Sequence, residues 1–394
     1  MNRCESHDQG AVQPGCMAVF PREEFETRQD ALKQILVQKG IDLLLVNGPE
    51  NIFYLTGQQT PGYYTFMCLG IPIEGEPFLL LRELESWNAR ANTYVHNIAT
   101  YADNIAPGDA LASLIASMGL KGRRVALERT AWFLPVALFE QLEASLGKLL
   151  DGSGLVERLR LIKSPREIEM IAKASGTTDA GMIAGMRAVE AGSTENKVAA
   201  RMLGAAVECG SEYMGMDPFV TSGPKAGIPH TTWRRRVMEP GDGVLLELAG
   251  CFNRYHAALM RTVWIGRPPE KASEMMKTCE EALEEALAKV KPGNTCADVH
   301  NAAQAVIDRR GYTDNYRKRT GYGIGISFAP DWGEGNIVSL FHNVKTELRP
   351  GMCFHMPPAL RVYGCFTVGL SETVLVTETY HRTFSSIPRG MLEV

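Results

Sequence analysis

One stretch of the sequence combines residues that could do chemistry with the spacing of a β-hairpin. Residues 245–262 read LLELAGCFNRYHAALMRT, in which the acidic Glu247 precedes a turn and a second run that ends in Arg-Thr. This order is typical of a hairpin that holds metal ions between carboxylates. Ala258 stands where the second carboxylate would be. The hairpin therefore predicts an acidic site from which part of a metal centre is missing.

Three further stretches place polar residues where strands are expected: SGPKAGIPHTTW, TGYGIGISFAPDWGE and GMCFHMPPALRVYGCFTVGLSETVLVTE. They contain the further candidate residues His230, Tyr322, Asp331, Trp332, His355 and Glu372. We take these residues and Glu247 as candidates for one site.

The elements that would position this site follow a first domain of alternating helices and strands. From Arg22 the pattern predicts an amphipathic helix that stops at Gly40, an apolar strand at Leu43–Val46 and a turn at Gly48-Pro49. The runs PFLLLR and RVALER predict strands, and helices are expected near residues 109–118 and 135–146. We expect an α/β domain over residues 20–154.

The second domain, over residues 155–394, carries all of the candidates named so far. A strand-like run, VERLRLI, is followed by Ser164-Pro165, a helix N-cap with proline at the first helical position. Helices are predicted at residues 271–294 and 295–312, enclosed by strand-rich stretches at 244–266 and 353–377. The apolar and methionine positions on these helices are interpreted as core rather than cofactor contacts.

Composition excludes several classes of function. The chain has 394 residues, 45% of them apolar, and a net charge of −4, which indicates a globular protein with sizeable cores. Basic clusters such as residues 234–236 are short and lack interleaved aromatics, so no nucleic-acid partner is expected. Nine cysteines without a C-x-x-C pair indicate reduced thiols and a cytoplasmic protein. No run has the apolar length of a signal peptide or a membrane helix, so neither export nor membrane association is expected.

The order and spacing of the four polar stretches resemble the pita-bread superfamily, which includes methionine aminopeptidase, prolidase and creatinase. The resemblance implies an α/β N-terminal domain and an α+β pita-bread C-terminal domain. It also implies that the five metal-ligand positions of the superfamily fall here on Glu247, Ala258, Tyr322, Met356 and Glu372. Alanine has no donor atom, neutral tyrosine is a weak ligand and a thioether is soft, so we expect no metal and no other cofactor.

The resemblance also assigns catalytic roles. His230 stands where the superfamily places a catalytic histidine, and it is kept together with Glu247 and Glu372. Two carboxylates could hold a planar N–C–N cation through charge-assisted hydrogen bonds while His230, buried between them, moves protons. The alternatives are a structural His230 in a catalytically silent peptide-binding domain, and an amidinohydrolase of the creatinase type.

Within the superfamily the motifs ELAG, RYHA, RT, YGIGI, PDWGE and FHMP resemble those of ectoine hydrolases. This implies a metal-independent hydrolase of a C–N bond in a cyclic amidine, with ectoine or 5-hydroxyectoine opened to N-acetyl-diaminobutyrate. Met260 and Met356 speak against creatine, because creatinase has glutamates there. Arg361 and the loop GQQTPGYYTFMCLG differ from what we expect of an ectoine hydrolase, which leaves the exact small-molecule substrate open.

Other residues are candidates for substrate binding. Trp332 could form a wall beside the substrate cation, and the loop of Asp331, Trp332 and Glu334 either closes the pocket or is a turn capped by aspartate. His355 and His256 are either pocket groups or buried structural histidines. Arg261 is expected to brace the hairpin. The resemblance to creatinase implies a homodimer in which Tyr63 and Tyr64 reach the pocket of the other subunit.

Overall fold

The computed structural model describes residues 12–394. Contacts divide the chain into two compact units, the first ending at Arg160 and the second beginning at Leu161. The boundary expected from the sequence, between residues 154 and 155, lies a few residues earlier.

The first unit is built on a mixed sheet of six strands in the order β4-β3-β2-β1-β5-β6. Strand β1 is a run of four buried apolar residues that pairs parallel with β5 and antiparallel with β2, as expected for a strand covered on both faces. The strands are β1 Leu43–Val46, β2 Cys68–Pro72, β3 Phe78–Arg82, β4 Asn97–Tyr101, β5 Val125–Leu127 and β6 Leu150–Asp151.

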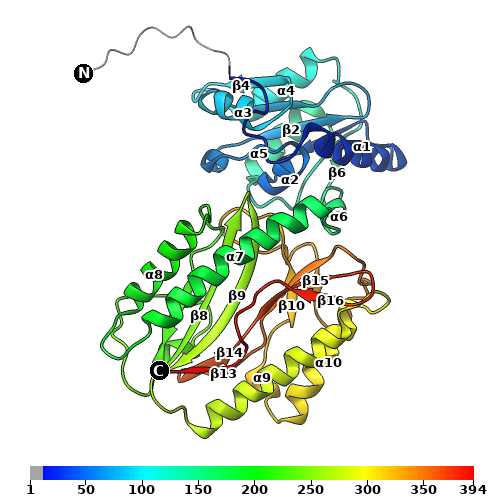
Figure 1. Cartoon of the computed structure of the whole chain (residues 1–394). Coiled ribbons are helices and arrows are strands. Elements are labelled where there is room, and N and C mark those ends of the chain that lie inside the picture. The colour runs from blue at the N-terminus through cyan, green and yellow to red at the C-terminus, as the bar shows by residue number, and fades with distance from the viewer. Residues whose placement is uncertain (1–11) are drawn as a thin grey trace, which may run out of the picture. The chain divides into compact units, whose positions relative to one another are not determined.

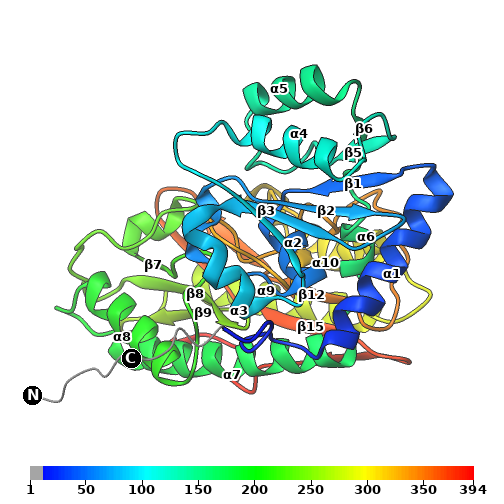
Figure 2. The ribbon, with the colours of Figure 1, turned by 90° about the horizontal axis from the view of Figure 1, so that it is seen from above.

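Within the described residues of this unit, six α-helices accompany the sheet: α1 Arg22–Lys39, α2 Pro49–Thr56, α3 Ser86–Asn92, α4 Pro107–Ser117, α5 Val136–Leu146 and α6 Glu157–Arg160. Figure 2 shows α4 and α5 side by side. Helix α1 ends where predicted, because Gly40 adopts a left-handed φ of 66° and its N–H bonds back to the last turn. Two local predictions were wrong: Pro49 opens a helix, for which its fixed φ is suited, and part of VERLRLI forms helix α6.

The second unit contains three sheets, in the orders β17-β9-β8-β7, β11-β10-β12-β15-β16 and β13-β14. Residues 245–262 form the predicted hairpin, in which β8 and β9 pair antiparallel along their full length. The strands are β7 Phe219–Ser222, β8 Gly243–Phe252, β9 Tyr255–Trp264, β10 Gly321–Gly323, β11 Ser339–Leu340, β12 Cys353–Met356, β13 Ala359–Val362, β14 Phe366–Gly369, β15 Glu372–Val376, β16 His381–Thr383 and β17 Leu392–Glu393.

Four helices cover these strands: α7 Pro165–Ala188, α8 Glu195–Glu208, α9 Glu270–Lys289 and α10 Cys296–Arg309. In Figure 1, α7 runs along the β8–β9 hairpin, and α9 and α10 accompany the strands of the C-terminal half. Ser164 caps α7 as predicted, within a capping box closed by Glu167. None of the helices in residues 12–394 combines the length and apolar composition that a bilayer span requires.

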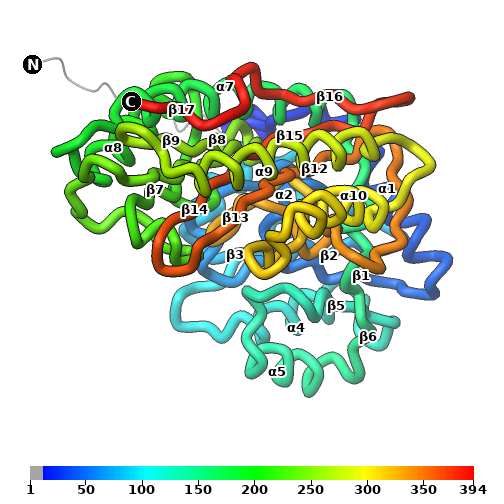
Figure 3. The backbone as a smooth tube through the Cα atoms, turned by 90° about the horizontal axis from the view of Figure 1, so that it is seen from below, coloured from blue at the N-terminus to red at the C-terminus, as the bar shows by residue number. Residues whose placement is uncertain are grey.

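Two apolar cores hold the second unit together. One joins α7 and α8 to the hairpin through residues such as Met182 and Met202, and the other joins α9 and α10 to the C-terminal strands through Met275 and Met276. The interpretation of the methionines on the helix at residues 271–294 as core is therefore confirmed for Met275 and Met276. The last strand, β17, returns to pair with β9, as Figure 3 shows. The polar residues of the candidate site lie on strands and loops between these cores.

Candidate active site

Strand β8 places Glu247 between two neighbouring strands, opposite Phe219 of β7 and Met260 of β9. The side chain is half-buried, and no group in residues 12–394 donates a hydrogen bond to its carboxylate. Burial raises the pKa of Glu247 well above the ordinary carboxyl value, although nearby Lys318 and Arg361 oppose the rise. A desolvated carboxylate without an internal partner is a candidate base, nucleophile or cation ligand.

Two cations near Glu247 were not recognised as site residues from the sequence. Lys318 lies in the loop before β10, and Arg361 lies on β13; both are half-buried. Burial lowers the pKa of Lys318, the charge of Arg361 lowers it further, and Glu247 raises it. Burial also lowers the pKa of Arg361, again opposed by Glu247. The three charges therefore act on one another and form the electrostatic centre of the site.

A chain of hydrogen bonds runs beside this centre. Tyr322 on β10 pairs in register with His355 on β12, and His355 Nδ1 lies 2.9 Å from the Tyr322 hydroxyl. Trp332 Nε1 donates to the same hydroxyl at 2.9 Å. On the other side, His355 Nε2 lies 2.7 Å from Ser371 Oγ, which accepts the backbone N–H of Met260 at 2.7 Å.

This chain fixes the tautomer of His355. The Ser371 hydroxyl has one proton to donate, and among the described residues the only acceptor for it is His355 Nε2. Nδ1 then carries the ring proton and donates it to the Tyr322 oxygen. The other tautomer would leave the proton of the fully buried Ser371 without an acceptor, whereas this one leaves over only the proton of the half-buried Tyr322. The Tyr322 oxygen accepts twice, so its own proton is free to point elsewhere. Burial raises the pKa of Tyr322 and the charge of Glu247 raises it further, so Tyr322 is a neutral donor beside Glu247.

Glu372, at the start of β15, is already paired, which departs from its predicted role as an open ligand for a substrate cation. Its Oε1 accepts from Arg261 Nη2 at 3.0 Å and from Arg389 Nε at 3.3 Å. Burial raises the pKa of Glu372 while the two arginines oppose that rise. Only Oε2, which is buried and lacks a partner in the described chain, could accept a further donor.

Arg261 braces the hairpin as expected. Its guanidinium donates to the carbonyl oxygens of Met260, Ser371, Ile387 and Pro388 as well as to Glu372. These bonds tie β9 to β15 and to the C-terminal segment, so Arg261 is fully engaged in structure.

His230 does not lie buried between the two carboxylates, and the expectation of a buried position for this histidine is wrong, while its catalytic role stays a prediction. The residue is exposed, has a φ of 55°, and its ring forms no hydrogen bond with Glu247 or Glu372. It stacks on Phe219, with ring centroids 6.2 Å apart, and Phe219 in turn meets the edge of Trp332 at 5.5 Å. The preceding residues 228–229 are also exposed, so this loop leaves His230 on the solvent side of the aromatic rings.

The remaining candidates of the second unit are explained by local structure. His256 bonds through Nδ1 to the carbonyl of Arg254 and accepts the N–H of Gly215 at Nε2, so it is a buried structural histidine. Asp331 is exposed and accepts the N–H groups of Trp332 and Gly333, which makes it a turn cap. Trp332 is only 3% exposed and supports Tyr322 rather than offering an open wall.

The residues at the superfamily's metal-ligand positions do not fit a pair of metal ions. Glu247 and Glu372 are the only carboxylates among them, and Glu372 is already paired with two arginines. Ala258 and Met356 offer no hard donor, and Tyr322 uses its oxygen to accept two hydrogen bonds. Within residues 12–394, no three His, Cys, Asp or Glu side chains gather as metal binding requires.

The two tyrosines predicted to bind substrate lie in the first unit, on the short 3₁₀ segment Pro61–Tyr64. Tyr63 is half-buried and packs edge-on against Phe133 at 5.5 Å, whereas Tyr64 is 75% exposed. Both line a small cavity together with Asn47, whose buried side-chain amide has no partner in the described chain.

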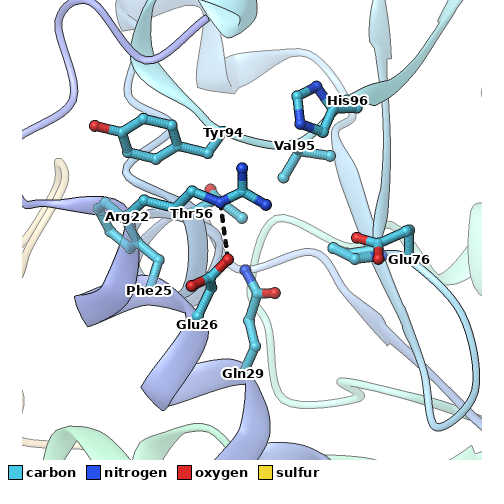
Figure 4. A pocket seen from close by; sticks show the side chains of 10 residues that line it. Arg22, Phe25, Glu26, Gln29, Thr56, Glu76, Tyr94, Val95 and His96 are labelled. Carbon is cyan, nitrogen blue, oxygen red and sulfur yellow. Dashed lines mark hydrogen bonds and ion pairs between the residues drawn. The ribbon is translucent and has the colours of Figure 1, made fainter.

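A second cavity of the first unit, shown in Figure 4, contains none of the predicted residues. Its charged groups include Arg22 and Glu26, which are paired with each other at 2.8 Å. We therefore place the candidate active site in the second unit, around Glu247.

Comparison with known proteins agrees with this fold. Residues 169–378 match metallopeptidase family M24, and residues 28–162 match the creatinase/prolidase N-terminal domain. The chain therefore belongs to family M24, with a creatinase-type N-terminal domain before the pita-bread domain. This confirms the fold class expected from the sequence.

Among individual proteins, the chain is similar to the ectoine hydrolase of Halomonas elongata, with 32% identity covering 94% of this chain and 98% of that protein. It is also similar to an Xaa-Pro dipeptidase of Lactobacillus helveticus, with 26% identity covering 92% and 97%. The solved prolidase from Thermococcus sibiricus superimposes with a TM-score of 0.85 at 24% identity, covering 94% and 99%. The family and these relatives support assignment as a hydrolase.

Proposed function

We propose that this protein is a metal-independent hydrolase of a C–N bond in a cyclic amidine, and that its substrate is ectoine or 5-hydroxyectoine, opened to the N-acetyl-diaminobutyrate product. The observation that carries the proposal is the unpaired, desolvated carboxylate of Glu247 beside the Tyr322 hydroxyl. Similarity to the ectoine hydrolase of Halomonas elongata supports the choice of substrate.

The charge of the substrate before it reacts explains why a carboxylate binds it well. An amidinium carries its positive charge over a planar N–C–N unit whose N–H groups a carboxylate accepts in charge-assisted hydrogen bonds. The half-buried position of Glu247 strengthens that attraction relative to water. Binding the cation also favours the ionised form of Glu247, which burial alone disfavours.

Ring opening consumes one water molecule. An oxygen adds to the central carbon of the amidinium, one C–N bond of the resulting tetrahedral species breaks, and the products are an amide and an amine. Glu247 either removes the proton from the attacking water or adds to the carbon itself before water releases it. The Tyr322 hydroxyl donates a hydrogen bond to the departing nitrogen or to the developing charge, and His355 with Trp332 holds it in place.

A dipeptidase of the metallopeptidase kind is the function suggested by the family and by the relative from Lactobacillus helveticus. The ligand set of this chain does not support it, because one carboxylate is consumed by arginines and three of the five positions lack a suitable hard ligand. A catalytically silent domain would have no use for a charged residue left without a partner at the centre of the fold.

The experiment is incubation of the purified protein with ectoine, 5-hydroxyectoine, creatine and Xaa-Pro dipeptides, followed by mass spectrometry. The proposal predicts a product from an ectoine that is heavier by one water, with creatine and the dipeptides unchanged. Cleavage of the dipeptides without turnover of either ectoine would overturn it.

A further inference from the structure

Three charged side chains of the candidate site have no direct partner within the described chain. Glu247, Lys318 and Arg361 form no side-chain hydrogen bond or ion pair with any of residues 12–394. Arg361 Nε is buried and unsatisfied. Partly buried charges are normally paired, because moving a charged group out of water costs free energy unless a partner compensates it. The unpaired groups therefore indicate charges that a ligand supplies.

Hydrogen bonds hold the segments that carry Lys318 and Arg361 near each other. Asn315 Nδ2 donates to the carbonyl oxygen of Arg361 at 2.6 Å, which ties the loop before β10 to strand β13. The buried Tyr316 bonds to Thr320 at 3.2 Å and anchors the other side of Lys318. Lys318 therefore lies on a short loop that these two hydrogen bonds hold on either side of it.

The charges do not balance within the protein. One carboxylate, Glu247, stands against two cations, Lys318 and Arg361, and it bonds directly to neither. Arg319, the next residue, is already used: it donates to Ser339 Oγ at 2.8 Å and lies over the ring of Tyr322. An anionic group between Lys318 and Arg361 would satisfy both, and Glu247 would then be left for a cation.

We propose that Lys318 and Arg361 bind the carboxylate of the substrate, so that the site selects compact zwitterions in which an amidinium and a carboxylate lie on one small ring. The proposal rests on the proposed function and names the residues that determine its specificity. Arg361 offers the planar fork that matches a carboxylate, and Lys318 adds a point charge. Because the two cations bind the carboxylate of the substrate, Glu247 alone is left to bind its amidinium, and no second carboxylate is needed there.

The alternative is that the two cations only moderate the charge of Glu247. These roles differ in a measurable way. A carboxylate-binding role affects only substrates that have a carboxylate, whereas a background role affects every cyclic amidine equally.

The test compares ectoine with 2-methyl-1,4,5,6-tetrahydropyrimidine, the same ring with hydrogen in place of the carboxylate. For the parent protein we expect kcat/KM for ectoine to exceed that for the probe by about 10- to 100-fold, the usual worth of a hydrogen bond to a charged group. Arg361→Met should lower kcat/KM for ectoine by a similar factor and leave the probe almost unchanged. Lys318→Met should act in the same direction, and Arg361→Lys should restore part of the discrimination.

The matched control is Arg317→Met, because the Arg317 side chain is 70% exposed and lies next to Lys318 in the chain; it should leave both rates unchanged. Circular dichroism and the melting temperature show whether each variant is folded. If Arg361→Met does not fold, Arg361→Lys takes its place in the comparison of the two substrates. An equal loss of kcat/KM for ectoine and for the probe in the folded Arg361 variants would overturn this inference and leave the proposed function standing. Failure of the parent protein to open either ring would instead overturn the proposed function.

Discussion

Glu247 combines features that rarely occur together in a residue with a purely structural role. It is half-buried on a central strand, its carboxylate accepts no hydrogen bond from the described chain, and two cations act on it without contacting it. Glu372 shows the contrast, since it has the same side chain on a nearby strand and is held by two arginines. At the scale of single residues, the positions that the resemblance assigns to metal ligands hold one open carboxylate and one paired carboxylate.

Glu247→Gln should lower kcat by at least about 100-fold with the fold intact, the usual scale for a positioned proton-transfer group. In the parent protein the ionised carboxylate is lost as the pH falls through the raised pKa of Glu247, so the acid limb of kcat/KM should lie above the ordinary carboxyl pKa of about 4.3. Steady-state kinetics across pH measure both effects. Parent-like turnover by a folded Glu247→Gln variant would remove Glu247 from the mechanism.

The same pKa predicts an effect on stability. A carboxyl group whose folded pKa is raised destabilises the native state at pH values above its unfolded pKa, and the penalty is complete once the pH exceeds the folded pKa. Glu247→Gln should therefore raise the melting temperature at pH 8 and have little effect at pH 4. Thermal unfolding at the two pH values checks this. A rise in melting temperature that is larger at pH 4 than at pH 8 would mean that the pKa of Glu247 is not raised in the folded state.

Tyr322→Phe tests the hydrogen-bond chain. The change removes the hydroxyl that accepts from His355 and Trp332 and that is left with a proton to donate. We expect kcat to fall by about 100-fold with KM little changed, because the interaction is used mainly in the transition state. A rise in KM with unchanged kcat would instead make Tyr322 a binding group.

At the scale of elements, the parts that the sequence predicted well are those with a local signal. An acid, a turn and a following Arg-Thr define the β8–β9 hairpin, and Ser164 with Pro165 defines the start of α7. Lys318 was missed because it stands in the run RKR, which resembles a solvated surface. Its loop is tied by Asn315 to Arg361, which lies far away in the sequence, so that its partial burial has no local signal. The predicted burial of His230 was wrong for a similar reason, since a motif gives the position of a residue in the chain but not its exposure.

One buried ion pair fixes the loop that carries Trp332. Lys163 Nζ lies 2.6 Å from Glu334 Oε2, both side chains are 2% exposed, and Glu334 also accepts the N–H of Ile326. Glu334→Ala should lower the free energy of unfolding by about 3–5 kcal/mol, because it leaves a buried charge without its partner. The double replacement Lys163→Met with Glu334→Leu should cost less than the single change. Urea denaturation of the two variants measures this, and a double replacement that costs more than Glu334→Ala would contradict the coupling.

At the scale of the whole molecule, the chain keeps the fold of family M24, and our proposal is that other chemistry replaces that of the family's metal centre. Arginines neutralise Glu372, and Lys318 and Arg361 supply positive charge beside Glu247. Protein cations thus stand near both carboxylates. The homodimer expected from the resemblance to creatinase stays a prediction, which light scattering can test.

The measurement that tests the central claim most directly is the turnover of ectoine by protein whose metal content is known. The protein is dialysed against EDTA, its zinc, manganese, cobalt and iron are measured by mass spectrometry, and ring opening is then assayed with and without each added metal. We predict that full turnover persists with far less than one metal ion per chain and that no metal raises it. Loss of turnover after dialysis, restored by one of these metals, would contradict the account.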